Sequence, residues 1–200
     1  MIDLSRYQVV LGSTSERRLQ ILSDVLKINC EVIKPDFEEN LSKCLPPRDY
    51  VYGTSKGKID AIIRDNTFEK PTIVICCDTI IDWNGNILEK PITKSKQLEM
   101  FENYKTNPHL HVLSSIQVAR VDKEVEIVSE VVETKLTFDS GLSQDVVQSY
   151  IESEEGLNVA GGFKYQESGN ILFNSLQGDY FNVVGLPAKV TFKLIHDLVV

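Results

Sequence analysis

One apolar run near the middle of the chain constrains the fold more than any other feature. The segment PTIVICCDTIID, which begins at Pro71, is apolar, rich in β-branched residues and continuous rather than alternating. Such a run is typical of a strand that is covered on both faces of a sheet. We therefore predict a buried central strand here, in a chain of 200 residues whose 42% hydrophobic content is enough for a full core.

Strand and helix patterns alternate along the rest of the chain. The expected strands are 7–11, 30–34, 109–120, 124–138 and 171–176, with a turn at 84–86. The expected helices are 16–26, 47–64, one from Thr93 or Ser95 to Tyr104, one capped by Ser143 that runs to Glu152, and one with Pro187 in its first turn that runs to Leu198. The two long consecutive strands do not fit a purely parallel sheet, so we predict an α/β fold with a mixed twisted sheet and flanking helices.

The charge balance limits the partners that the chain can bind. The formal net charge is -8, which argues against a broad nucleic-acid-binding face, because such faces need clustered positive charge. A small polyphosphate could still bind where Lys and Arg converge. No signal peptide or membrane-spanning run is visible, and the adjacent Cys76 and Cys77 are expected to be buried reduced thiols on opposite faces of a strand, so we expect a cytoplasmic protein with no membrane partner.

The segment VVLGSTSERR places two arginines, Arg17 and Arg18, at the start of a predicted helix. Cations at this end oppose the helix dipole. One explanation is that an anion binds at the turn formed by Ser13, Thr14 and Ser15, where backbone N–H groups are free. The alternative is that Ser15 caps the helix and both arginines are solvated. The spacing alone leaves both explanations open.

Asp78 and Thr79 interrupt the apolar run from Ile73 to Ile81. An acid in such a run is costly unless it is paired, bound to a metal or facing a cleft. Mg²⁺ takes carboxylate ligands and usually keeps waters and substrate phosphates, so a metal ligand or general base is the favoured interpretation of Asp78. The alternative is an acid at a frayed strand end.

Further candidates are weaker when each is taken alone. Lys90 precedes Pro91, which fixes the local backbone, and Lys58 lies in a predicted helix whose pattern is interrupted by Gly53 and Gly57. Lysines in such positions are usually solvated. Gln166 lies in the glycine-rich segment AGGFKYQESG, where its amide could bind a base edge, although the segment could also be a flexible connector. His109 and His111 share a strand face, but no thiolate or carboxylate motif completes a zinc site.

Seven short motifs in order resemble those of the Maf family of nucleoside triphosphate pyrophosphatases, over nearly the whole chain. The turn LGSTSERR is similar to A-S-x-S-x-R-R, PDFEEN supplies the family's acidic residue as Glu39, and YVYGTSKGKI keeps the lysine of Y-V…L-A-x-x-K-A as Lys58. The other four are CCDT for G-A-D-T, GNILEKP for G-x-I-L-x-K-P, AGGFKYQ for A-G-x-Y-x-x-Q, and GDYFNVVGLP, expected to be a packed loop, for G-x-Y…V-V-G-L-P.

The chain departs from these motifs at a few positions. Gly12 replaces the usual Ala, Cys76 and Cys77 replace a Gly-Ala pair, and TNPHLHVLSS lacks the glycine of S-G-x-x-H-x-V-x-T and has Ser114 or Ser115 where Thr is usual. The lysine motif is also altered, at Thr54, Ser55 and Ile59. These changes affect the expected pocket shape more than the expected reaction.

The resemblance implies a single Maf-like, inosine-triphosphatase-like domain over residues 1–200, with two lobes around a cleft, and a possible homodimer. The implied reaction is hydrolysis of a nucleoside triphosphate to the monophosphate and pyrophosphate with Mg²⁺ or Mn²⁺. The implied roles are proton acceptor for Asp78, metal binding for Glu39 and Asp78, phosphate binding for Ser13, Ser15, Arg18, Lys58 and Lys90, and substrate choice for Arg17, Thr79 and Gln166.

The Arg, Thr and Gln combination is that of the subgroup that acts on dTTP and UTP. A nucleotide-binding regulator of cell division with weak catalysis is the alternative, and it would share the same pocket. Retention of Asp78, Glu39, Lys58 and Lys90 together favours the enzyme.

Overall fold

The computed structural model describes residues 2–200, which form two compact units. Unit 1 comprises the chain up to Thr79, Ser114–Val132 and Gly185–Val200, and unit 2 comprises Ile80–Leu113 and Glu133–Val184. Three long strands contribute residues to both units, so neither unit is one continuous segment. That residues 1–200 act as a single domain stays a prediction.

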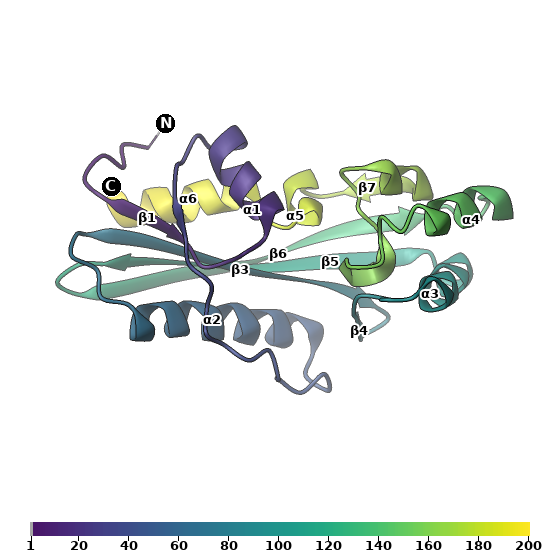
Figure 1. Cartoon of the computed structure of the whole chain (residues 1–200), viewed down its shortest axis with the longest axis horizontal. Helices are drawn as coiled ribbons and strands as arrows, with labels where there is room; N and C mark the ends of the chain where they lie inside the picture. Colours follow the sequence, from purple (N-terminus) through teal and green to yellow (C-terminus); the bar gives the residue numbers. More distant parts are fainter. Residues whose placement is uncertain (1) are drawn as a thin grey trace. The chain divides into compact units, whose positions relative to one another are not determined.

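The strands form one seven-stranded sheet (Figure 1). They are β1 (Gln8–Leu11), β2 (Glu31–Val32), β3 (Thr72–Trp83), β4 (Asn86–Leu88), β5 (His109–Val121), β6 (Val125–Phe138) and β7 (Phe173–Gln177). The order is β2-β1-β3-β5-β6-β7, with β4 paired to β3. β1 runs parallel to β2 and β3, whereas β4 is antiparallel to β3 and β7 is antiparallel to β6. The predicted α/β class and mixed sheet are confirmed.

Six α-helices are present within the described residues. They are α1 (Glu16–Gln20), α2 (Pro47–Asp65), α3 (Lys94–Thr106), α4 (Gln144–Glu152), α5 (Tyr180–Val184) and α6 (Ala188–Val199). Short 3₁₀ turns cover Ala160–Gly162 and Ser168–Leu172. None of the helices within residues 2–200 has the length and apolar character that a membrane crossing needs.

The predictions at helix ends were confirmed at some positions and wrong at others. The predicted helix over 16–26 changes after Gln20 into a π-helix, Ile21–Val25, whose wider turn is closed by the Leu26 N–H donating to the Ile21 carbonyl. Ser143 is the N-cap of α4, which ends at Glu152 as predicted, although the Ser143 side chain makes no capping hydrogen bond. Pro187 is the N-cap of α6 rather than a first-turn residue. At the start of α3, Thr93 rather than Ser95 is the cap, because its hydroxyl accepts from Lys96 N–H.

Two short elements were missed altogether. The strand β4 has three residues, too few for a periodicity to show. The segment GDYFNVVGLP, predicted as a packed loop, contains α5, and the Asp179 carboxylate accepts from the Phe181 N–H at its start. This bond satisfies an N–H group that a helix start leaves without a partner.

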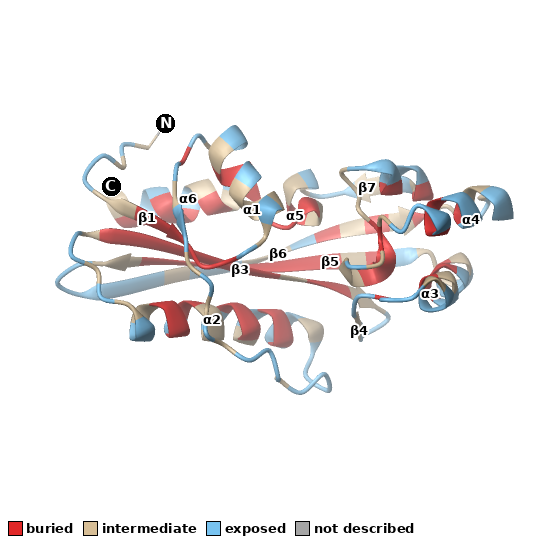
Figure 2. Ribbon diagram, in the orientation of Figure 1, coloured by how far each residue is buried: buried red, intermediate tan, exposed pale blue. Residues whose placement is uncertain are grey.

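The core of unit 1 forms between the sheet and α2. Residues Val10, Val74 and Cys76 lie on the face that α2 covers with Ile59 and Ile62, and all five are buried (Figure 2). Figure 1 shows α1 and α6 on the opposite face of these strands. The Cys77 side chain points to that opposite face, where its Sγ lies 3.4 Å from the Gly185 carbonyl oxygen.

The two cysteines are buried as predicted, and burial raises the pKa of the Cys76 thiol to about 12 and also raises the pKa of the Cys77 thiol. All four cysteines are free, but Cys44 is exposed and Cys30 only half-buried. We therefore expect the Cys76 and Cys77 thiols to be unreactive, because they are buried and because their raised pKa values keep them protonated at neutral pH.

The core of unit 2 is mainly aromatic. Phe101 lies 5.7 Å from Phe138 and 6.0 Å from Tyr150 between ring centroids, and Phe163 lies 4.5 Å from Phe173. These rings connect α3 and α4 to β6 and to the glycine-rich segment after Gly156. The segment therefore packs on a rigid core and is not a flexible connector.

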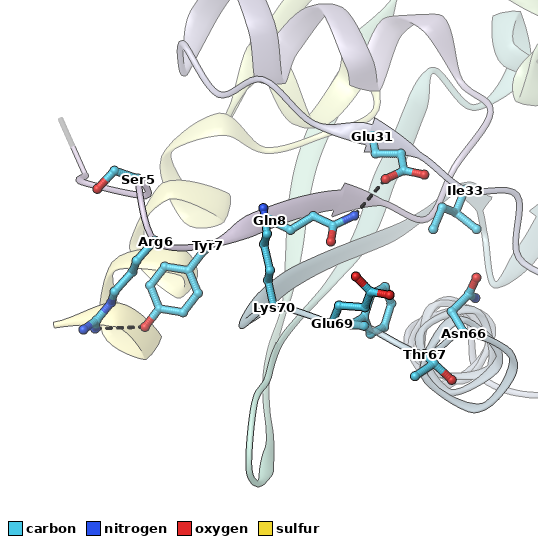
Figure 3. Close-up of a pocket in the computed structure, with 11 residues that line it drawn as sticks. Ser5, Arg6, Tyr7, Gln8, Glu31, Ile33, Asn66, Thr67, Glu69 and Lys70 are labelled. Atoms are coloured by element: carbon cyan, nitrogen blue, oxygen red, sulfur yellow. Dashed lines mark hydrogen bonds between the residues drawn. The ribbon is translucent and has the colours of Figure 1, made fainter.

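A groove of about 670 Å³ lies in unit 1 at the start of β1 (Figure 3). Its lining includes Arg6, Gln8, Glu31, Glu69 and Lys70, and the Gln8 amide donates to the Glu31 carboxylate across 2.8 Å. None of the predicted site residues lines it. The groove therefore does not correspond to the predicted site.

The departures from the Maf motifs at Gly12 and Cys76 are related, because the two residues pack against each other. A Cβ at Gly12 would overlap Sγ of Cys76 and would approach Ile62 Cγ1 to 3.1 Å. The chain thus carries the larger side chain on β3 and none on residue 12, whereas the motifs have Ala at the first position and Gly at the second. The two changes compensate each other in volume.

We expect Gly12→Ala to lower the free energy of unfolding by about 1–3 kcal/mol, because the added methyl group overpacks a buried site. Cys76→Ala in the same chain should recover part of this loss, since it removes the sulfur that the methyl group meets. Chemical denaturation of both single variants and the double variant measures the coupling. Strict additivity would show that the two positions do not compensate.

Candidate active site

The alternation of side chains along β3 separates two groups of polar residues in unit 1. Successive strand residues point to opposite faces of a sheet. Asp78 therefore shares the α2 face with Cys76, while Thr79 shares the opposite face with Cys77. Asp78 is buried and lies inside β3, which continues to Trp83, so the alternative of an acid at a frayed strand end is wrong.

Lys58 of α2 lies between two carboxylates. Its Nζ is 2.7 Å from Asp78 Oδ1 and 2.8 Å from Glu39 Oε1. The Lys58 and Asp78 side chains are only 11% and 9% exposed, whereas that of Glu39 is 53% exposed. The expectation that this lysine could be solvated is wrong, because it compensates the charge of a buried acid. Of the two adjacent acids, Glu39 rather than Glu38 makes this contact.

Opposing effects act on the pKa of Lys58. Burial lowers it, and so does the nearby charge of Arg18, but the charge of Asp78 and the hydrogen bonds to Asp78 and Glu39 outweigh them, so the pKa is raised. Lys58 is therefore cationic at neutral pH. An ammonium group has three N–H donors, so one remains for a further acceptor.

Two glycines of α2 admit the segment that carries Glu39. A Cβ at Gly57 would overlap the ring of Phe37, and a Cβ at Gly53 would lie 2.9 Å from Leu41 Cδ1. The helix nevertheless runs unbroken through both glycines. The predicted helix is therefore confirmed, and both glycines form the surface on which residues 37–41 lie, beside Lys58.

Arg18 binds the groups on the other face of β3. Its Nη2 donates to Thr79 Oγ1 at 3.2 Å, its Nη1 to Ser13 Oγ at 3.1 Å, and its Nε to the Gly185 carbonyl at 2.9 Å. The alternative that both arginines are merely solvated is wrong for Arg18. A guanidinium has five N–H donors, so two remain after these bonds.

The hydroxyls of the first turn support this arrangement. Ser13 Oγ also accepts from the Ser15 N–H at 3.2 Å. Ser15 occupies the N-cap of α1, but its side chain makes no capping bond, so helix capping does not explain its presence. Arg17 is half-buried. The substrate contacts of Ser13, Ser15 and Arg17 stay predictions.

Sequence reasoning missed two partners of Thr79. Its Oγ1 lies 2.8 Å from Ser114 Oγ and 3.3 Å from the Gly185 oxygen. Gly185 belongs to the motif GDYFNVVGLP, but a backbone carbonyl carries no signal in the sequence. Ser114 was noted only as a departure from a motif. On the α2 face, Ser55 Oγ and Ser115 Oγ lie 2.7 Å apart in a similar buried contact.

Lys90 and Gln166 belong to unit 2. Lys90 is exposed beside Pro91, and Gln166 is half-buried in the loop after Gly162. In unit 1 the structure brings together two sets of three predicted residues, one on each face of β3, namely Ser13, Arg18 and Thr79, and Glu39, Lys58 and Asp78. The participation of Lys90 and Gln166 in the same site stays a prediction.

The acids fit a divalent metal of the magnesium type. Two carboxylates, Asp78 and Glu39, already hold one cation, the Lys58 ammonium. Within residues 2–200, no three His, Cys, Asp or Glu side chains gather closely enough to hold a metal by themselves. Mg²⁺ is usually bound through one or two carboxylates together with waters and substrate phosphates, so this pair of ligands is compatible with it.

Fold and site together define an α/β protein that carries, on either face of β3, a cation with polar partners, and beside one of these cations two acids of the kind that bind magnesium. The family model described as Maf-like protein matches residues 8–198, and the chain belongs to the Maf family. Its relatives include dTTP/UTP pyrophosphatases of Saccharomyces cerevisiae (38% identical, 96% of this chain and 90% of that protein), Clostridium novyi (34%, 96% and 97%) and Schizosaccharomyces pombe (31%, 98% and 85%). The suspected family is confirmed.

We expect Gly57→Ala and Gly53→Ala to have different effects on the melting temperature. Ala is favoured over Gly in a helix by about 1 kcal/mol, so Gly53→Ala, which meets only the flexible end of Leu41, should raise the melting temperature or leave it unchanged. Gly57→Ala should lower it, because the methyl group displaces the Phe37 ring. Hydrogen exchange at residues 37–41 should be faster in Gly57→Ala alone. Equal stabilisation of both variants would contradict the packing role of Gly57.

Proposed function

We propose that this chain hydrolyses dTTP and UTP to the nucleoside monophosphate and pyrophosphate with Mg²⁺ or Mn²⁺. The observation that carries the proposal is the cluster of Lys58, Asp78 and Glu39 on one face of β3, with Arg18 on the other. The charge of Arg18 acts on Lys58. Guanidinium and ammonium groups both bind phosphate oxygens, and a triphosphate offers several such oxygens.

Each group has a role in this proposal. Asp78 would accept the proton of the attacking water, and Glu39 and Asp78 would hold the metal, which would supply positive charge near the phosphates. Lys58 and Arg18 bind phosphate oxygens through their remaining N–H donors, together with Lys90 and the hydroxyls of Ser13 and Ser15. Stabilisation of the charge that develops on these oxygens is the main catalytic task in phosphoryl transfer.

The pyrimidine preference rests on the names of the relatives and on three side chains. Arg17, Thr79 and Gln166 occupy the positions that the family uses for substrate choice. Gln166 carries an amide that can meet both a carbonyl and an N3–H, as uracil and thymine present. The proposal includes a cytoplasmic location, which the four free cysteines support, and a homodimer, which rests on the resemblance alone.

Release of pyrophosphate from a panel of standard and modified nucleotides, with Mg²⁺ or Mn²⁺, tests the proposed function. We expect dTTP and UTP to be the best of the standard triphosphates. Tight nucleotide binding without release of pyrophosphate would instead support a regulator. Release of inorganic phosphate, with the diphosphate as product, would reject the reaction.

We expect Asp78→Asn to lower kcat by about a hundredfold to ten-thousandfold while the fold persists, because the amide neither accepts the proton nor binds metal well. Asp60→Asn, which changes an exposed carboxylate of α2, is the matched control. Steady-state kinetics and circular dichroism of both variants provide the measurement. Near-normal turnover of folded Asp78→Asn would reject the base and metal roles together.

We expect Gln166→Glu to lower kcat/KM for dTTP and UTP by about ten- to a hundredfold, because a base carbonyl loses its donor. Hydrolysis of a purine triphosphate should not fall in parallel, so the pyrimidine-to-purine ratio should drop. Gln144→Glu, exposed on α4, is the control. If all nucleotides weaken equally, Gln166 does not contact the base, and Thr79 and the loop after Gly161 become the next candidates.

A further inference from the structure

The loop that carries Gln166 accepts hydrogen bonds from two side chains of α3. Gln97 Nε2 donates to the Gly162 carbonyl at 2.7 Å, and the Tyr104 hydroxyl donates to the Gly161 carbonyl at 3.0 Å. Gln97 is fully buried and Tyr104 nearly so. Two consecutive carbonyls of the loop thus accept hydrogen bonds from side chains that lie about two turns apart on one face of α3.

Gln97 makes this bond at a cost. Its Oε1 has no hydrogen-bond partner among the described residues. A buried polar atom without a partner is unfavourable, so an apolar residue would suit the core better if packing alone decided the position. The compensating gain is the bond to the Gly162 carbonyl, which fixes the loop.

The same loop is fixed at its other contacts. The Tyr150 hydroxyl accepts from the Lys164 N–H at 2.9 Å, and Glu155 accepts from the Gly169 N–H at 3.1 Å. A Cβ at Gly156 would overlap the Gly162 carbonyl, so the chain passes too close to itself for any side chain there. Gln166 lies within this fixed stretch.

The loop also holds the segment that carries Lys90. The Gly161 N–H donates to the Glu89 carbonyl at 3.2 Å, and the Ile92 N–H donates to the Leu157 carbonyl at 3.0 Å. Ile92 has a φ of 64°, a left-handed conformation that is strained for a β-branched residue. Such strain persists only where surrounding contacts determine the backbone. The two bonds on either side of Lys90 are such contacts.

We propose that Gln97 and Tyr104 are positioning residues that fix the 156–166 loop, and through it Gln166, in the geometry that selects the nucleotide base. This inference rests on the proposed function, because it takes Gln166 as the group that contacts the base. Neither α3 residue needs to touch the nucleotide. Loss of either bond is expected to loosen the loop and to weaken base selection without removing the catalytic group Asp78.

Tyr104→Phe is the sharpest test, because it removes only the hydroxyl and keeps the ring in the aromatic core. Gln97→Met, of similar length and apolar, tests the second bond. Tyr7→Phe in unit 1 is the matched control. We expect kcat/KM for UTP to fall about tenfold in both α3 variants, mainly through KM, with GTP little changed. Hydrogen exchange at residues 161–166 should become faster in both and stay unchanged in Tyr7→Phe.

The outcomes separate this inference from the proposed function. If the wild type shows no preference for UTP over GTP, the proposed function has failed, and the selectivity claim fails with it. If the preference exists but both α3 variants keep it, or lose activity on both nucleotides equally, the positioning role is rejected. Unchanged exchange at residues 161–166 would reject the loop constraint itself.

Discussion

A single ammonium group, Nζ of Lys58, holds together the acids on which the proposed chemistry depends. Asp78 lies inside an apolar strand, where an uncompensated carboxylate would be costly. Lys58 compensates it at 2.7 Å and also reaches Glu39 at 2.8 Å, so three segments far apart in sequence meet at one atom. Because loss of one partner would leave a buried charge unpaired, the three side chains form a coupled unit.

The packing around this unit depends on small residues where chains approach closely. Gly57 gives Phe37 room beside α2, and Gly12 gives Cys76 room on β3. On the other face, Arg18 connects the first turn, β3 and the residue after α5 through Ser13, Thr79 and Gly185. This network places the groups of unit 1 before any nucleotide binds, which is the preorganisation that electrostatic catalysis requires.

The sequence predicts the part of this structure that depends on local pattern. The continuous apolar run identified β3, the alternation of strands and helices identified the mixed α/β sheet, and the ordered motifs identified the Maf family. Asp78 could be singled out because an acid is improbable in such a strand unless something compensates it.

The remaining features depend on contacts between distant segments. The bond from Arg18 to the Gly185 carbonyl joins residues 167 positions apart, and a carbonyl has no sequence signature. In the sequence, Gly12 and Cys76 are two unrelated departures from the family motifs. Only the structure shows that a side chain at residue 12 would meet the sulfur of Cys76. The prediction of one regular helix over 16–26 was wrong after Gln20, where a π-helix begins, because a helix pattern fixes the buried face but not the hydrogen bonding at the ends.

Binding of Mn²⁺, followed by electron paramagnetic resonance, tests the central claim that Asp78 and Glu39 form a metal site for a bound triphosphate. The titration compares the wild type, Glu39→Gln and Asp78→Asn, with and without a UTP analogue whose bridging oxygen between the α and β phosphates is replaced by methylene. We expect the wild type to bind Mn²⁺ more tightly when the analogue is present, and each variant to lose most of this gain. Mn²⁺ affinity that is the same in all three proteins, with and without the analogue, would contradict the account.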